Sequence, residues 1–426
     1  MPEKFVKVVK NQIRGEVKTV LKWGRVALVV LLSLAVLTGC AAGLVPMSPQ
    51  ADLSKLDRAV LEGNTEFAFD LFREVNREDR EKNVFISPLS VSLALTMTYQ
   101  GARGTTQAGM AEALNYQGVD LEALNETYRQ LLTYLAGVDK DIELRIGNSI
   151  WVREGEDIQP AFLEVNKNVF RAEVAELDFS RPEAAATING WIAKATAGKI
   201  DKMLEGEIPP HVIMYLINAI YFRGQWAEQF DPRNTFPAEF RAGTGLKQQV
   251  QMMSKFGRAE YGEGEDYRVV KLPYGKGKTA MYVVLPGDDV EINAFIESLD
   301  RAKWEEIRQS TSTQRDVVVQ LPRFKMEYGV KLLNDSLAKL GMAEAFTDRA
   351  DFSGIRDDVY ISRVMHKAVI EVNEEGSEAA GATVVEVVET AALEPLRFIA
   401  DRPFVFLIAE EETGTILFMG KMWSVE

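Results

Sequence analysis

The chain is poor in the side chains on which many enzyme sites depend, with one cysteine and two histidines among its 426 residues. The lone Cys40 has no partner for an internal disulfide bond. Two histidines, His211 and His366, are too few for a histidine-rich metal cluster, and no HExxH, CxxC or GxSxG motif occurs. The sequence therefore argues against a metal-dependent or histidine-assisted enzyme, and we expect neither a metal ion nor another cofactor.

Positive charge is also scarce outside the first 39 residues. The whole chain has a formal net charge of -14. Residues 1–39 contain 7 of the 49 basic and 2 of the 63 acidic residues, which leaves 42 basic and 61 acidic residues and a net charge of -19 for the rest. Because phosphate backbones repel a protein this acidic, we expect no nucleic-acid partner.

Two features that superficially suggest chemistry have simpler interpretations. The stretch GKGKT at Gly275 to Thr279 is similar to a phosphate-binding loop, but Leu272 stands where that motif needs its first glycine. We interpret it as a lysine-rich hairpin turn. His211 follows two prolines and precedes an apolar run, which is typical of a solvated loop residue.

The N-terminus has the order of a signal peptide. A stretch with seven basic residues precedes the apolar run VALVVLLSLAVL at 26–37, and Thr38, Gly39 and Cys40 follow directly. Leu37 to Cys40 resembles the bacterial lipobox, in which the cysteine thiol takes a lipid. We therefore expect a lipoprotein signal peptide at 1–39, and a lipidated Cys40 with a tether at 40–54.

One alternative for this segment remains open at the sequence level. An uncleaved signal-anchor helix is possible because apolar residues continue loosely to Val45. Both interpretations place the folded part outside the cytoplasm, tethered to the outer side of the cytoplasmic membrane or to the outer membrane and cell surface. Ala41 is not the Asp-type signal that retains a lipoprotein at the inner membrane, which favours the outer surface.

Beyond the tether, periodicity predicts a mixed α+β protein. Helical spacing of apolar residues predicts helices over 53–75 and 89–99, with Ser87 as a cap for the second, and a short strand ends at Pro88. Apolar or alternating runs bounded by turn residues predict strands at 142–152, 212–222, 267–272, 279–285, 317–321, 404–409 and 415–422. Because strands and helices do not alternate regularly, we expect large, mostly antiparallel sheets.

The segment EVNEEGSEAAGATVVEVVETAALEP at 371–395 is compatible with two states. Small side chains come first and β-branched ones follow, so the segment fits both an exposed loop and a buried strand. As a strand it would place small or apolar residues on one face: Ser377, Ala379, Gly381, Thr383, Val385 and Val387. Glu378 and Glu386 would lie on the other face, which suits solvent.

Several motifs in order resemble those of the serpin family from about Leu53 to the end. The hinge signature is matched by HKA at 366–368 and EVNEEGSEAA at 371–380, with Ser377 where threonine is more usual. The C-terminal signature is matched by ADRPF at 400–404 and TGTILFMG at 413–420. Further matches are NVFISPLS at 83–90, GARGTT at 101–106 and LINAIYFRGQW at 216–226.

The resemblance implies a fold and a mode of action. Serpins have one domain of three β-sheets and eight or nine helices with an exposed reactive-centre loop, which corresponds to a single domain at 55–426 and a loop at about 374–396. The loop is bait for a serine protease and, in some members, a cysteine protease. After cleavage it inserts as a central strand of the main sheet, and the protease is trapped as an acyl-enzyme. We expect a monomeric inhibitor and not an enzyme.

The resemblance also assigns roles to residues. His366, Ser87, Ser90 and Asn218 match the shutter, a polar cluster beneath the sheet, and Trp226 matches the breach, where insertion begins. The hinge comprises Glu375, Gly376, Ser377, Glu378, Ala379, Ala380, Gly381, Ala382 and Thr383.

The position of the cleaved bond has two solutions. Counting forward from Gly376 at the family's spacing places it between Thr390 and Ala391, whereas counting back from Pro403 places it between Ala392 and Leu393. Both put a small uncharged residue at the specificity position, which favours elastase-like or subtilisin-like proteases with shallow pockets. Neither Lys nor Arg occurs between Val369 and Leu396, so trypsin-like targets are disfavoured. The rival hypothesis is a non-inhibitory serpin that acts as a carrier or chaperone.

Cys40 provides the test of the tether. We expect the chain, produced in a bacterial host with a labelled fatty acid, to incorporate the label, because the thiol of Cys40 is the acceptor. Cys40→Ser should abolish the labelling while the protein accumulates. Equal labelling of both chains would contradict the lipoprotein assignment.

Overall fold

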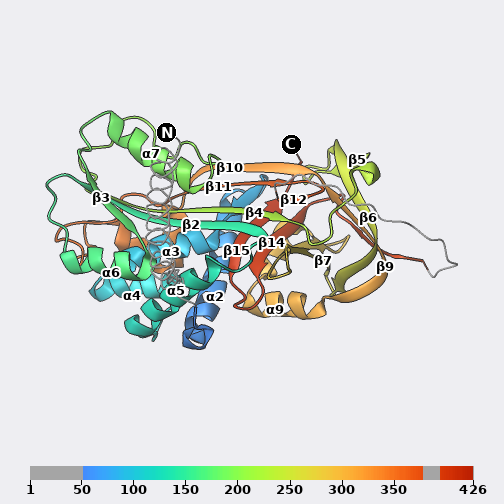
Figure 1. Ribbon diagram of the computed structural model, residues 1–426, viewed down its shortest axis with the longest axis horizontal. Coiled ribbons are helices and arrows are strands. Elements are labelled where there is room, and N and C mark those ends of the chain that lie inside the picture. The colour runs from blue at the N-terminus through green and yellow to red at the C-terminus, as the bar shows by residue number, and fades with distance from the viewer. Residues whose placement is uncertain (1–50, 378–393, 426) are drawn as a thin grey trace, which may run out of the picture. The chain divides into compact units, whose positions relative to one another are not determined.

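The computed structural model describes residues 51–377 and 394–425, and this part contains nine α-helices and fifteen strands (Figure 1). The predicted mixed α+β class with three sheets is confirmed. Residues Ala51–Glu426 form one compact unit. No helix within the described ranges is long and apolar enough to cross a membrane.

Six of the nine described α-helices lie before residue 196, and the other three lie between strands farther along the chain. The nine are α2 (Arg58–Glu78), α3 (Pro88–Tyr99), α4 (Gly104–Ala113), α5 (Leu121–Leu135), α6 (Pro160–Phe170), α7 (Glu183–Ala195), α8 (Ile292–Ser298), α9 (Arg301–Ser310) and α10 (Asn334–Leu337). Short helical turns lie at η1 (Leu53–Lys55), η2 (Pro232–Asn234), η3 (Ala338–Met342) and η4 (Ala343–Phe346).

Most of the predicted strands are longer than the apolar runs that predict them. The described strands are β1 (Val84–Ile86), β2 (Ile142–Arg153), β3 (Glu173–Leu177), β4 (Met214–Gln225), β5 (Phe236–Arg241), β6 (Lys247–Glu263), β7 (Tyr267–Tyr274), β8 (Thr279–Pro286), β9 (Ser312–Pro322), β10 (Phe324–Leu332), β11 (Met365–Val372), β12 (Gly376–Ser377), β13 (Leu396–Ile399), β14 (Phe404–Glu410) and β15 (Ile416–Met422).

Helix α3 is the central helix of the core. Eleven of its twelve residues are buried, which matches a sequence that is apolar or small on every side. Ser87 caps its N-terminus by accepting a hydrogen bond from the backbone N–H of Ser90, and Pro88 occupies the first turn, where its missing N–H costs nothing. The cap predicted for Ser87 is therefore present.

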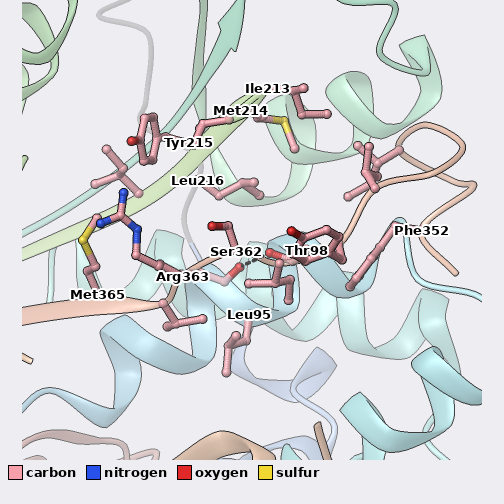
Figure 2. Close-up of a pocket in the computed structure, with 18 of the residues that line it drawn as sticks. Leu95, Thr98, Ile213, Met214, Tyr215, Leu216, Phe352, Ser362, Arg363 and Met365 are labelled. Carbon is pink, nitrogen blue, oxygen red and sulfur yellow. Dashed lines mark hydrogen bonds between the residues drawn. The ribbon is translucent and has the colours of Figure 1, made fainter. Parts of the chain in front are cut away.

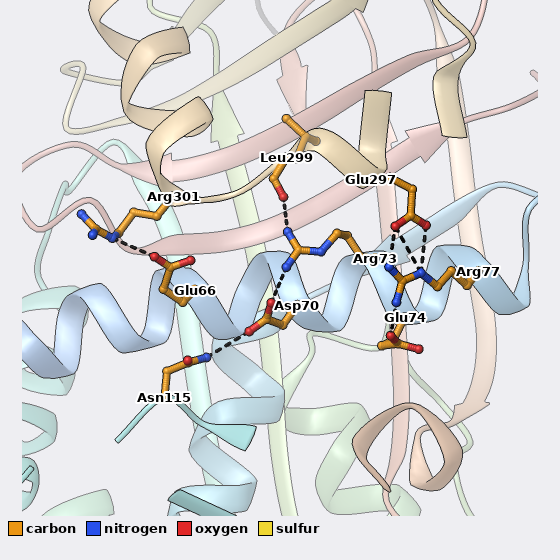
Figure 3. A network of polar contacts seen from close by, with 9 residues as sticks. All are labelled: Glu66, Asp70, Arg73, Glu74, Arg77, Asn115, Glu297, Leu299 and Arg301. Atoms are coloured by element: carbon orange, nitrogen blue, oxygen red, sulfur yellow. Dashed lines mark hydrogen bonds and ion pairs between the residues drawn. The ribbon is translucent and has the colours of Figure 1, made fainter. Parts of the chain in front are cut away.

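Helix α2 packs Phe67, Leu71 and Phe72 into the core and uses its polar face to hold neighbouring elements (Figure 3). Arg77 Nε lies 2.9 Å from Glu297 of α8, and Arg301 Nε of α9 lies 3.0 Å from Glu66. These partly exposed ion pairs fix orientation more than they add stability.

The largest sheet has nine strands in the order β1-β15-β14-β8-β7-β6-β9-β13, with β5 paired to β6. All residues of β14, β15 and β8 are buried, which explains their continuous apolar runs. The aromatic rings of Phe85 and Phe418 stack across β1 and β15 with centroids 5.4 Å apart. This sheet includes β13, the first strand after the expected reactive-centre loop, and β13 pairs in parallel with β9.

The other two sheets border one gap. One has the order β12-β4-β2-β3 and the other consists of β10 and β11 (Figure 1). β12 is antiparallel to β4, and the chain reverses between β11 and β12, so β4 and β11 run in the same direction. From β12 toward the N-terminal ends of β4 and β11, no described strand pairs with the facing edges of these two strands. An antiparallel strand would fit between them.

The seven strands predicted from the sequence are all present, and the two predicted helices correspond to α2 and α3. The sequence analysis missed β6, with seventeen residues, because its polar and charged residues interrupt the apolar alternation. It missed β10 for the same reason. Gly275 lies in the turn between β7 and β8, as predicted, and His211 lies exposed in a loop.

A buried lysine joins the C-terminal strand to α2. Lys421 of β15 is fully buried, and its Nζ donates to Asn76 Oδ1 at 2.6 Å, to Asn293 Oδ1 at 3.2 Å and to the backbone oxygens of Asp79 and Arg80 at 3.0 and 2.8 Å. Burial lowers the pKa of Lys421 to about 8. With four acceptors around it, all three N–H donors of the ammonium group have hydrogen-bond partners.

We expect Lys421→Met to destabilise the protein by roughly 3 kcal/mol or more, because removing one partner leaves buried acceptors unsatisfied. Chemical denaturation followed by tryptophan fluorescence measures the change. Lys278→Met is the matched control, since Lys278 is half-exposed and pairs with Glu412, and it should change stability by less than about 1 kcal/mol. Equal effects of the two substitutions would contradict the assignment.

Candidate functional site

A tight hairpin closes the gap between β4 and β11 at the C-terminal ends of these two strands. The backbone N–H of Asn373 donates to Gly376 O at 3.0 Å, so only Glu374 and Glu375 form the loop. Gly376 then pairs with Gln225 and Ser377 with Gly224. Gly376 has a φ of 146°, and an added Cβ would lie 2.1 Å from Gly224 O, so only glycine is accommodated.

Trp226 and Tyr274 form the wall of this hairpin. Their rings stack with centroids 4.5 Å apart, and Trp226 Nε1 donates to Asn373 O at 2.9 Å. The backbone N–H of Trp226 donates to Glu375 O at 2.8 Å. Tyr274 Oη lies 2.8 Å from Ser377 Oγ, and Ser377 is 2% exposed. Trp226 therefore holds the turn at the point where the hinge enters the sheet.

Glu374 is a buried carboxylate with complementary partners. It is 4% exposed, and it accepts hydrogen bonds from Arg323 Nε at 3.1 Å, Arg323 Nη2 at 2.5 Å and Thr235 Oγ1 at 2.5 Å. Burial by itself raises the pKa of Glu374, but the hydrogen bonds from Arg323 and Thr235 outweigh burial and lower it. The ion pair attaches the acidic turn to the start of β10.

The predicted shutter residues Ser87, Ser90 and His366 lie together at the N-terminus of α3. The backbone N–H of Ser87 donates to His366 Nε2 at 3.0 Å, and Ser87 Oγ donates to Leu417 O at 2.7 Å. Asn218 lies across the gap on β4, where its Nδ2 donates to Asn148 Oδ1 at 2.7 Å. His366 and Asn218 thus border the gap from opposite strands.

The hydrogen bond from Ser87 sets the tautomer of His366. Since Nε2 accepts, the proton of the neutral ring is on Nδ1. The side chain is 4% exposed, and burial lowers the pKa of His366 from 6.5 to about 4. The shutter histidine is therefore neutral at physiological pH, and protonation would replace the acceptor with a donor that faces another N–H group.

Several predicted site residues lie outside the described residues, so their assignments stay predictions. They are Cys40, the hinge residues Glu378, Ala379, Ala380, Gly381, Ala382 and Thr383, and the two candidate cleavage positions, Thr390 with Ala391 and Ala392 with Leu393.

The sequence analysis missed the residues that hold the hinge in place. Tyr274 and Arg323 lie about 50 to 100 positions before Ser377 and Glu374, at the ends of strands, and no local pattern connects them. Glu374 is buried in an ion pair with Arg323, and the acidic sequence around it gave no signal of that burial. Among the described residues, no group of His, Cys, Asp or Glu could hold a metal ion.

Comparison with known proteins agrees with this geometry. The family model described as Serpin (serine protease inhibitor) matches residues 62–425. The chain belongs to the serpin family. The description of the family and the names of the curated relatives support the expectation of a serine protease inhibitor rather than an enzyme.

Two curated serpins illustrate the similarity. The chain is 37% identical over 375 residues to the leukocyte elastase inhibitor of Bos taurus, which covers 85% of this chain and 98% of the relative. It is 34% identical over 376 residues to an uncharacterized serpin-like protein of Methanosarcina acetivorans, covering 86% and 88%.

Among solved serpin structures, the thermophilic serpin tengpin in its native state has a TM-score of 0.79 at 32% identity, covering 87% of this chain and 95% of that one. The thyroxine-binding globulin complex with thyroxine has a TM-score of 0.77 at 29% identity, covering 86% and 99%. The serpin fold predicted from the motifs is therefore confirmed.

The pKa of His366 predicts an acid-dependent loss of stability. Between pH 6.5 and about 4 the unfolded chain binds a proton on this ring and the native protein does not, so stability falls as the pH decreases through this window. The full contribution is roughly 3 kcal/mol. We expect His366→Gln, which keeps an acceptor for Ser87, to lose less stability between neutral pH and about pH 4 than the wild type.

Denaturant midpoints at a series of pH values measure this difference. His211→Gln is the control, because it removes the exposed histidine and should keep the wild-type dependence on pH. An unchanged acid sensitivity in His366→Gln would show that His366 is not the responsible group.

Proposed function

We propose that this serpin is a single-use inhibitor whose cleaved loop inserts between β4 and β11. The observation that carries the proposal is the pairing of Gly376 and Ser377 with the end of β4, which starts an antiparallel strand inside the gap. Beyond β12, no described strand pairs with the facing edges of β4 and β11, so an added strand could hydrogen-bond to both.

The existing pairing defines the register that we expect for the inserted strand. Continued one residue at a time, it brings Thr383 opposite Asn218 on β4 and opposite His366 on β11. The same register brings Val387 opposite Met214, the first residue of β4. The inserted strand would thus extend over the full length of β4.

Side-chain character fits this register. Ser377 faces the buried side, so the alternate residues Ala379, Gly381, Thr383 and Val385 would face the core. Glu378 would lie beside Arg223 on the outer face. The strand buries only small or apolar side chains, and on the outer face Glu378 would have charged neighbours of both signs, Arg223 on β4 and Glu371 on β11.

The chemistry of trapping uses the first half of ordinary proteolysis. The protease serine attacks the carbonyl carbon of the residue before the cleaved bond, the new amino terminus leaves with a proton, and the loop remains attached as an ester. Insertion then competes with hydrolysis of that ester by water. Inhibition results when insertion is faster.

We place the cleaved bond between Thr390 and Ala391, with Ala392 and Leu393 as the alternative. A small uncharged residue at this position suits elastase-like or subtilisin-like proteases. The name of the Bos taurus relative, leukocyte elastase inhibitor, supports the elastase-like choice. Cysteine proteases are a further target class, because they form the analogous thioester.

We further propose that the inhibitor acts at a membrane surface through a lipid on Cys40. The support is the sequence of residues 1–54 alone: a basic stretch, an apolar run and a lipobox-like cysteine before the folded unit. A tether of about fifteen residues would keep the inhibitory domain close to the membrane on its outer side.

The proposal predicts a covalent complex with an elastase. We expect the chain from Ala51 onward to give a band resistant to SDS and heating, at the summed mass of inhibitor and protease. Ser377→Arg should slow insertion at least about tenfold, because it buries a guanidinium in place of a 2%-exposed serine, and should convert the inhibitor into a substrate.

Glu378→Arg is the matched control, because its side chain would face solvent, and it should still trap the protease. Mass mapping of the cleaved loop identifies the bond. Cleavage of the wild type without a complex would favour the non-inhibitory alternative, and equal trapping by Ser377→Arg would contradict the proposed insertion.

A further inference from the structure

A pocket of about 480 Å³ lies beside the gap, at the N-terminal halves of β4 and β11. Its walls come from α3, from β4 and from the segment between η4 and β11, and Figure 2 shows Leu95, Leu216 and Phe352 around its interior. The volume lies within the range of small-molecule sites, and the lining is mainly apolar.

Two polar groups at the pocket lack partners. Asn218 Oδ1 is buried without a hydrogen bond to any described residue, although its Nδ2 is bonded to Asn148. His366 also lines the pocket; its Nε2 accepts from Ser87, whereas no described residue is bonded to its Nδ1. One strand therefore offers an acceptor and the other a donor, both beside apolar walls.

The charged residues at the pocket are of both signs, and all are exposed except Arg356, which is partly buried and pairs with Glu156. Arg363 lies at one side of the pocket near Tyr215, and Phe352 lies at the opposite side (Figure 2). Asp357 and Asp358 line the same pocket and are also exposed. Because solvated charges of opposite sign favour neither a cation nor an anion strongly, the interior selects an uncharged ligand.

We propose that this pocket binds a small neutral apolar molecule that carries a hydroxyl group, such as an alkylphenol or an alcohol. A hydroxyl both donates and accepts, so its chemistry matches the unpaired oxygen of Asn218 on β4 and the Nδ1–H of His366 on β11. An apolar molecule without a hydroxyl leaves both protein groups unpaired and binds more weakly for that reason.

The ligand would also affect inhibition, a consequence that rests on the proposed function. In the register given above, Val385 would enter beside Leu216, a residue that lines the pocket. A bound molecule occupies that space, so it slows insertion and increases the fraction of protease that escapes by hydrolysis.

Binding is tested directly, without a protease, on the chain from Ala51 onward, which forms a compact unit. Titration calorimetry compares 4-propylphenol with propylbenzene, which has the same shape without the hydroxyl. We expect the phenol to bind at least about fivefold more tightly, as a net hydrogen bond would give. Equal affinities, or no binding of the phenol, overturn the proposal.

Two variants locate the site. Asn218→Leu removes the unpaired oxygen, so the preference for the phenol should fall toward unity. Leu216→Phe fills the pocket without changing the shutter residues, and it should weaken both compounds several-fold. Phenol binding that survives Leu216→Phe unchanged would place the ligand elsewhere and overturn the assignment, and circular dichroism verifies that each variant is folded.

The inhibitory consequence is measured separately, as protease trapped per mole of inhibitor with and without 4-propylphenol. A chain that binds the phenol at this pocket but traps no protease would contradict the proposed function and leave the binding site established. A chain that traps protease but does not bind the phenol would contradict the binding site alone.

Discussion

The structure depends on two parallel strands, β4 and β11, whose facing edges pair with no described strand beyond the two residues of β12. Backbone polar groups inside a sheet favour pairing with a neighbouring strand. The hairpin at Asn373 joins the two edges at one end and fills the first two positions with Gly376 and Ser377. Under the proposed mechanism, the native fold retains a favourable step, and cleavage of the loop would permit that step.

Specific contacts hold this state. At the C-terminal ends of β4 and β11, Tyr274 hydrogen-bonds Ser377, and Arg323 pairs with the buried Glu374. At the middle of the gap, Ser87 at the cap of α3 hydrogen-bonds the neutral His366. The first two contacts hold residues 374–377 at the end of β4, where the proposed insertion would begin, and the third joins β11 to the start of α3. The same residues would meet the inserted strand, so they serve the native state and the transition alike.

The pocket beneath the gap follows from the same constraint. A pocket lies between β4, β11 and α3, and Asn218 Oδ1 at this pocket has no hydrogen-bond partner among the described residues. Apolar walls with an unpaired donor and acceptor are the requirements for a small-molecule site. In this protein, a capacity to bind a ligand and a capacity to change conformation would therefore share one location.

The sequence by itself determined the core strands, α2, α3 and the family, because apolar alternation and the motifs around Ser87, Trp226 and His366 are local patterns. It also showed that the segment from Gly376 suits burial, since side-chain size is readable one residue at a time. The polar strand β6, the pairing of Ser377 with Gly224, the Glu374–Arg323 ion pair and the pocket were decided only by the tertiary structure. Each of these joins residues distant in the chain, and their distances depend on how the sheets pack.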